Sequence, residues 1–96
     1  MTPARRLVLS PRAVADLEEI AAFIARDNPV RARSFVDDLE GKCRAAAANP
    51  ELYPLRDDLG PEVRMVTHGR YLVLYRTLIA ENVVRIERVE IGRAHV

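Results

Sequence analysis

Three pairs of a polar residue followed by proline divide the first half of the chain: Ser10-Pro11, Asn28-Pro29 and Asn49-Pro50. A polar cap residue with proline at the first helical position is a helix start signal, and the residue before a proline resists the α conformation. The pairs therefore predict one helix that ends near Asp27 and a second that ends at Asn49. Because almost no loop separates them, the two helices must fold back as an antiparallel hairpin.

Apolar residues recur at three- and four-residue steps in both segments, as expected for amphipathic helices. On each helix these residues form an apolar stripe along one face. The stripe of the first helix comprises Ala13, Val14, Leu17, Ile20, Ala21 and Ile24. The second comprises Ala32, Phe35, Val36, Leu39, Cys43, Ala46 and Ala47. Cys43 lies on a stripe and reads as a small core residue. Acidic residues in the first half of the first helix, Asp16 among them, suit the positive end of the helix dipole.

The second half of the chain has the character of β-strands. Residues 62–67, 70–79 and 83–91 are rich in β-branched and aromatic residues, and short turns separate them, which predicts an antiparallel meander. In the last of these strands the apolar positions change parity, which suggests a bulge or a change of buried face near Glu87-Arg88.

A short candidate strand, 5–9, precedes the helices, and a connection, 49–61, follows them. Tyr53 and Leu55 could pin this connection to the core. The predicted order is β-α-α-β-β-β, an α+β fold in which the helical hairpin packs on a small antiparallel sheet. With 96 residues, we expect residues 1–96 to form a single domain.

Composition narrows the function classes. The net charge of +1 gives no global field that would draw the protein to nucleic acid or an anionic membrane. The longest apolar run, 20–25, is too short to span a membrane. The single cysteine excludes an internal disulfide framework and a multi-cysteine zinc site, and we expect a cytoplasmic protein.

Arginine accounts for 14 of the 15 basic residues. This bias fits a GC-rich genome, and it also fits a surface whose guanidinium groups bind carboxylates or phosphates bidentately. From residue 64 onward the chain has six arginines and three acidic residues, and Tyr71 and Tyr75 share one face of the middle strand. Such a sheet suits nucleic acid or an acidic peptide, although an ordinary solvated face remains the alternative.

The sequence predicts no catalytic residue, cofactor or metal site. It has no nucleophile motif, no glycine-rich phosphate loop and no strong metal-ligand spacing. Phosphodiester cleavage needs groups that titrate near neutral pH, and arginine stays protonated. The candidates are His68, His95, Tyr71 and Tyr75, and no spacing joins any two of them into an acid–base pair. We therefore favour a protein that is not an enzyme.

Five segments in order resemble the ParE/RelE superfamily of bacterial type II toxins, and within it the ParE side. They are SPRAVADLEEIAAFIA, NPELYP, Arg64, YLVLYR at 71–76 and IERVEIGR at 86–93. The resemblance covers nearly the whole chain. It implies the RelE/ParE toxin fold and a bacterial toxin–antitoxin system.

The superfamily contains two activities. RelE-like members cleave mRNA on the ribosome with basic residues and a late tyrosine, whereas ParE-like members poison DNA gyrase. Here the 49–61 connection has only Arg56 as a base, no tyrosine follows Tyr75, and Ala94 stands about where RelE-like enzymes place a late arginine. These departures favour the ParE side, although Ile91 stands where ParE-like chains commonly carry a histidine. The resemblance thus implies gyrase as target, with a ribosome-dependent endoribonuclease or an inactive relic as alternatives.

Either activity implies a cognate ParD-like antitoxin in a hetero-oligomer. We expect an amphipathic, acidic antitoxin segment laid across the helical hairpin and the sheet. The residues predicted to line the surface that meets the target or the antitoxin are Arg64, Tyr75, Arg76, Arg88 and Arg93. Whether this surface contacts nucleic acid directly stays open.

Overall fold

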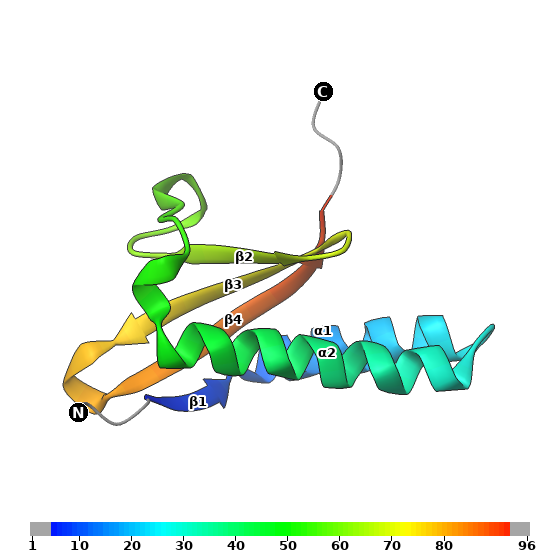
Figure 1. Ribbon diagram of the computed structural model, residues 1–96. Coiled ribbons are helices and arrows are strands. Elements are labelled where there is room, and N and C mark those ends of the chain that lie inside the picture. The colour runs from blue at the N-terminus through cyan, green and yellow to red at the C-terminus, as the bar shows by residue number, and fades with distance from the viewer. Residues whose placement is uncertain (1–4, 93–96) are drawn as a thin grey trace.

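The computed structural model describes residues 5–92 and has the predicted element order (Figure 1). The helices and strands are β1 (Arg6–Leu9), α1 (Pro11–Ala25), α2 (Pro29–Ala48), β2 (Arg64–His68), β3 (Tyr71–Leu78) and β4 (Val83–Ile91). Three short 3-10 turns complete the fold: η1 (Pro50–Leu52), η2 (Asp57–Leu59) and η3 (Ile79–Glu81).

Both helices begin at the predicted proline pairs. The Ser10 hydroxyl accepts a hydrogen bond from the Ala13 N–H at 3.0 Å, and Asn28 Oδ1 accepts one from the Arg31 N–H at 2.9 Å. These side chains satisfy backbone donors that a helix leaves free in its first turn. The helices run side by side, and their connecting turn extends beyond the sheet (Figure 1).

The sheet has the strand order β1-β4-β3-β2. The predicted meander is confirmed, because β2 pairs antiparallel to β3 and β3 antiparallel to β4. β1 differs: it pairs with β4 in parallel, so the four-stranded sheet is mixed rather than antiparallel. The helical hairpin provides the crossover that a parallel pair requires.

The predicted bulge is present in β4. Leu74 pairs with Arg88 and Tyr75 pairs with Ile86, which leaves Glu87 as the extra residue. The bulge resets the alternation, so Ile86 and Val89 both face the helices although they are three positions apart in the sequence.

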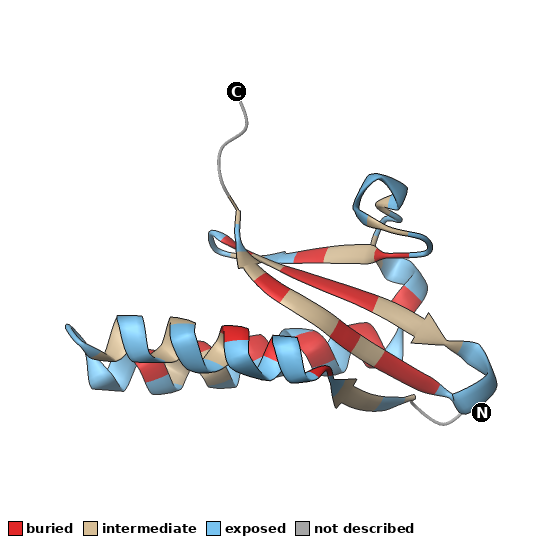
Figure 2. Cartoon of the chain, turned by 180° about the vertical axis from the view of Figure 1, so that it is seen from behind, coloured by how far each residue is buried: buried red, intermediate tan, exposed pale blue. Residues whose placement is uncertain are grey.

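The core lies between the helical hairpin and one face of the sheet (Figure 2). The largest fully buried side chains are Tyr75, Phe35, Leu39, Ile86, Val73 and Val84. Cys43 is buried among them, and burial raises the pKa of its thiol to about 11. We call the opposite side of the sheet the open face, because α1 borders it and neither α-helix covers it.

The connection between α2 and β2 is attached to the core at one of the two predicted residues. The Tyr53 ring packs edge-on against Tyr75 with 6.5 Å between the ring centroids. Leu55 instead remains 49% exposed, and its backbone bridges to Arg64 at the edge of the sheet.

Candidate functional site

The structure divides the predicted surface residues between the two faces of the sheet. Residues directly opposite each other on paired strands point to the same face. Arg64 is opposite Tyr75, whose ring is in the core on the helix side. Arg76 is opposite Arg85, and Arg88 is opposite Leu74, on the open face. Arg93 lies outside the described residues.

Tyr75 does not lie on the surface, which corrects the expectation that it meets a partner. Its exposed fraction is 0%, and its hydroxyl donates a hydrogen bond to the Pro50 carbonyl at 2.7 Å. Burial raises the pKa of the hydroxyl to about 12, so it stays protonated at neutral pH. The alternation of β3 explains the placement, because Tyr71, Val73 and Tyr75 all point toward the helices.

Arg64 also faces inward and holds the chain's own backbone. Its Nη1 donates to the Tyr53 carbonyl at 2.6 Å. Arg64 and Tyr75 therefore act together, since each fixes a carbonyl of the segment that follows α2. The Arg64 side chain is partly exposed, so a partner could contact the part of it that the hydrogen bond to Tyr53 leaves accessible.

Arg88 is on the open face, but two carboxylates bind it. Its Nε donates to Asp16 Oδ2 at 2.9 Å and its Nη2 to Asp16 Oδ1 at 3.3 Å. Its Nη1 lies 3.1 Å from Glu90 Oε1. The side chain remains 34% exposed, so a partner can contact it while the pair with Asp16 stays formed.

Asp16 is the residue of this site that the sequence analysis did not identify. Its side chain is 10% exposed, and Oδ2 also accepts the Val89 N–H of the β4 bulge region at 2.9 Å. Burial raises the pKa of the Asp16 carboxyl, but the hydrogen bonds from Arg88 and Val89 and the charges of Arg88 and Arg12 outweigh it and lower the pKa. The signal in the sequence is an acidic residue between the apolar positions Ala13 and Leu17.

We expect stability to depend on the ionisation of Asp16. Since its folded pKa lies below the ordinary value of 3.8, its contribution is complete above that pH and is lost as the pH falls through the folded pKa. Urea unfolding measured between neutral and acid pH should show that the stability difference between the wild type and Asp16→Asn shrinks below pH 3.8. A difference that stays constant across this range would contradict the assignment.

The other arginines of the open face also contact groups of the chain itself. Arg76 Nε donates to the Pro61 carbonyl at 3.1 Å, and Arg85 Nε lies 3.2 Å from Glu87 Oε1. Near the same face, the partly exposed Arg56 pairs with Asp58, with 2.7 Å between Nη2 and Oδ2. The arginine-rich face thus offers fewer free guanidinium groups than its composition indicates.

A groove of about 750 Å³ lies between α1 and the η2 segment and is lined from both faces of the sheet, by Leu72 and Arg88 on the open face and by Tyr71 and Ile91 on the helix side. Its apolar residues are Ile20, Phe23, Leu59, Tyr71, Leu72 and Ile91, and its cations are Arg26, Arg56 and Arg88. Phe23 is 61% exposed, and the Arg26 guanidinium lies 5.8 Å from the centroid of its ring. An apolar groove with charged borders is suited to bind a macromolecular partner.

Of the predicted proton-transfer candidates, His68, Tyr71 and Tyr75 have their rings on the helix side of the sheet, although Tyr71 also borders the groove that Arg88 lines. The His68 ring packs on Phe35 with 5.6 Å between centroids, and the Tyr71 ring packs on Phe35 at 4.8 Å. His95 lies outside the described residues. Within residues 5–92 no group of three metal-ligating side chains is close enough to hold a metal ion. None of the helices in the same range combines the length and the apolar character of a membrane span.

Solved structures of toxin–antitoxin systems share this fold. The structure of the chromosomal ParDE toxin–antitoxin system from P. aeruginosa superposes with a TM-score of 0.76 at 19% identity, covering 94% of this chain and 98% of that one. The RelBE2 complex from Mycobacterium tuberculosis gives 0.65 at 23% identity over 99% and 98% of the two chains. The isolated E. coli RelE toxin gives 0.67 at 19% identity over 96% and 88%.

The sequence itself identifies the family. No protein of curated function matches the chain. The profile described as "ParE toxin of type II toxin-antitoxin system, parDE" matches residues 7–94. This match spans both helices and all strands but the first residue of β1, so the chain belongs to the ParE toxin family of type II toxin–antitoxin systems.

Proposed function

We propose that this toxin acts by binding and inhibiting DNA gyrase and that it does not cleave RNA. The observation that carries the proposal is the chemistry of the open face. There the guanidinium groups of Arg76, Arg85 and Arg88 are held by carbonyls and carboxylates of the chain, on the opposite side of the sheet from His68 and the Tyr75 ring.

Cleavage of a phosphodiester by acid–base chemistry needs a positioned group that exchanges a proton near neutral pH. Burial raises the pKa of the Tyr75 hydroxyl to about 12, and the hydroxyl donates a hydrogen bond to the Pro50 carbonyl. His68 packs on Phe35 on the other side of the sheet. Arginines alone stabilise a phosphate but do not move the proton. These features support a binding toxin over a nuclease.

A cognate antitoxin of the ParD kind is the second partner that we propose. The family is that of type II toxin–antitoxin systems, in which a toxin is paired with an antitoxin. The similar structures include a ParDE system and RelBE complexes. The groove between α1 and the η2 segment leaves Phe23 exposed in the free toxin, and a partner would bury it. Since gyrase acts on the chromosome, we place both interactions in the bacterial cytoplasm.

The test compares the two targets with one preparation of the full chain. We expect inhibition of gyrase supercoiling in vitro, relieved by the antitoxin, and filamentation with a DNA-damage response on expression. Arg76→Glu should weaken gyrase inhibition at least about tenfold, because it reverses a charge on the open face. The matched control is Arg33→Glu, on the exposed side of α2.

Two outcomes would contradict the proposal. Messenger RNA cut at defined codons when the chain is supplied with ribosomes would show a RelE-like endoribonuclease. Normal growth on expression without antitoxin, together with unaffected gyrase, would show an inactive relic.

A further inference from the structure

We call the groove between α1 and the η2 segment the α1 groove. The residues that α1 contributes to its lining are Asp16, Glu19, Ile20, Phe23 and Arg26. Their spacing follows the helical repeat, so they lie along one face of α1. Phe23 is 61% exposed, and Ile91 of β4, which lines the same groove, is 52% exposed. The α1 groove therefore combines an exposed aromatic ring with an apolar lining that could receive such a ring.

Most charged residues at the α1 groove neutralise one another within the chain. Arg88 binds Asp16 at 2.9 Å and Glu90 at 3.1 Å. Arg56 binds Asp58 at 2.7 Å. These five residues already have partners of opposite sign, so they do little to select the charge of a molecule that enters the groove.

Two further charges on the α1 face have opposite signs. In the part of the chain that the structure describes, neither Glu19 nor Arg26 forms an ion pair. The Arg26 guanidinium lies near the Phe23 ring, 5.8 Å from its centroid. Glu19 and Arg26 are seven positions apart, about 10 Å along the helix, and Phe23 lies between them. A partner with a single sign of charge would gain at one end of this line and lose at the other.

A second copy of the chain complements this line at both ends. If two α1 helices pack antiparallel and cross near Phe23, the two-fold axis places Glu19 of each copy opposite Arg26 of the other. At the crossing, the Phe23 ring of each copy meets the apolar lining of the other copy's groove. The same surface thus supplies both halves of the interface.

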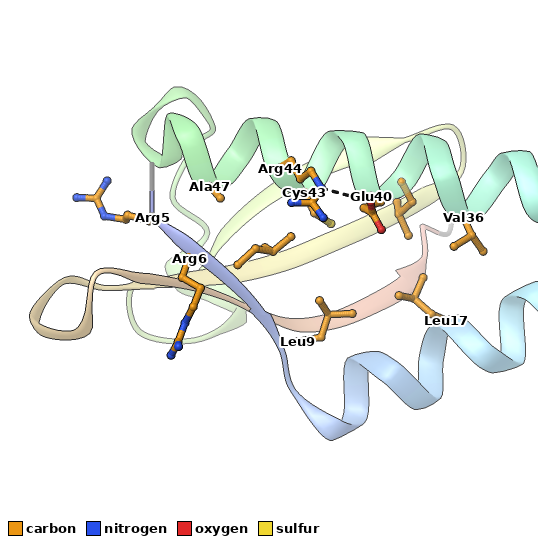
Figure 3. A pocket seen from close by; sticks show the side chains of 11 residues that line it. Arg5, Arg6, Leu9, Leu17, Val36, Glu40, Cys43, Arg44 and Ala47 are labelled. Carbon is orange, nitrogen blue, oxygen red and sulfur yellow. Dashed lines mark hydrogen bonds and ion pairs between the residues drawn. The ribbon is translucent and has the colours of Figure 1, made fainter. Parts of the chain in front are cut away.

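Another groove, between β1 and α2, lacks this self-complementarity (Figure 3). Arg5, Arg6 and Arg44 line it together with one acid, Glu40, whose Oε1 lies 3.3 Å from Arg44 Nε. Two copies joined through this groove would bring their remaining arginines together, and like charges repel. Of the two grooves, the α1 groove is therefore the one that suits a second copy.

We infer that two copies of the free toxin associate through the α1 groove, with antiparallel α1 helices that cross near Phe23. The exposed apolar side chains of the groove are Phe23, Leu59 and Ile91. This is a small set for a permanent dimer, whose interface commonly buries about 2,000 Å² or more. The dimer is therefore reversible, with a Kd in the micromolar range.

Analytical ultracentrifugation of the full chain without antitoxin, from micromolar to millimolar concentration, tests the association. We expect a reversible equilibrium between monomer and dimer. Phe23→Glu should abolish the dimer and leave the urea midpoint nearly unchanged, because the Phe23 side chain is largely exposed. A wild-type chain that stays monomeric throughout would overturn the inference. A monomeric chain in which Phe23→Glu weakens binding of the antitoxin would assign the groove to the antitoxin instead.

A charge swap tests the antiparallel arrangement. Glu19→Arg and Arg26→Glu should each raise the dimer Kd at least about tenfold, because each places like charges at both ends of the interface. The double variant Glu19→Arg/Arg26→Glu restores opposite signs at both ends, so its Kd should return to within about threefold of the wild type.

The matched control is Glu18→Arg, an exposed position of α1 outside the α1 groove, and its Kd should stay within about twofold of the wild type. A double variant as weak as the single variants would overturn the antiparallel crossing and with it the inference. Neither gyrase nor antitoxin is present in the ultracentrifuge, so a toxin that does not inhibit gyrase would remove the proposed target and leave this inference standing.

Discussion

Asp16→Ala should lower the free energy of unfolding by about 3 kcal/mol, a large part of the stability of a small domain. The substitution leaves the Val89 N–H without its acceptor and removes two hydrogen bonds from Arg88. An unsatisfied buried donor costs about 1–3 kcal/mol, and hydrogen bonds to a charged group add to this loss. Urea unfolding at neutral pH measures the change.

The matched control is Glu18→Ala, an exposed acidic residue on the same helix. It removes the same charge from the same helix two residues further on, so it reproduces any loss that arises from removing an acidic side chain of α1 as such. We expect a change within about 0.5 kcal/mol. Equal losses in the two variants would mean that Asp16 stabilises only the helix and not the contact between α1 and β4.

The helices could be predicted because their signals are local. Ser10 and Asn28 cap the first turn of a helix three residues away, so the sequence near each cap is sufficient. The bulge at Glu87 was also visible, since it shifts the alternation of apolar residues within one strand. The pairing of β1 with β4 could not be predicted in this way, because it joins residues 77 positions apart that no local pattern connects.

Contacts between residues far apart in the sequence also limited the prediction of the functional site. Asp16 reads as an acid that suits the helix dipole, and its partner Arg88 lies 72 positions further along the chain. Tyr75 was misplaced for another reason. The segment from Tyr71 to Tyr75 is apolar on both faces, so its alternation shows that the two tyrosines share a face without showing which face is buried. Only the packing of α2 on that side decides it.

Tyr75→Ala should destabilise the protein more than any other change discussed here, by about 3–5 kcal/mol. Its ring is fully buried and packs edge-on against Tyr53, so truncation leaves a cavity beneath the segment that follows α2. The Pro50 carbonyl would also lose the hydroxyl that it accepts from. We expect loss of toxicity in cells through loss of the folded protein, measured as a lowered urea midpoint of the purified variant.

Tyr75→Phe separates this structural role from a direct role in toxicity. Phenylalanine keeps the ring and removes only the hydrogen bond to Pro50, which should cost about 1 kcal/mol. Because the hydroxyl is buried and protonated, its removal should leave growth arrest, and the gyrase inhibition that we propose, within about twofold of the wild type. If Tyr75→Phe folds with near-normal stability and yet loses toxicity, the hydroxyl must reach the target or the reaction. Tyr75 would then be a functional residue that the toxin exposes only on binding.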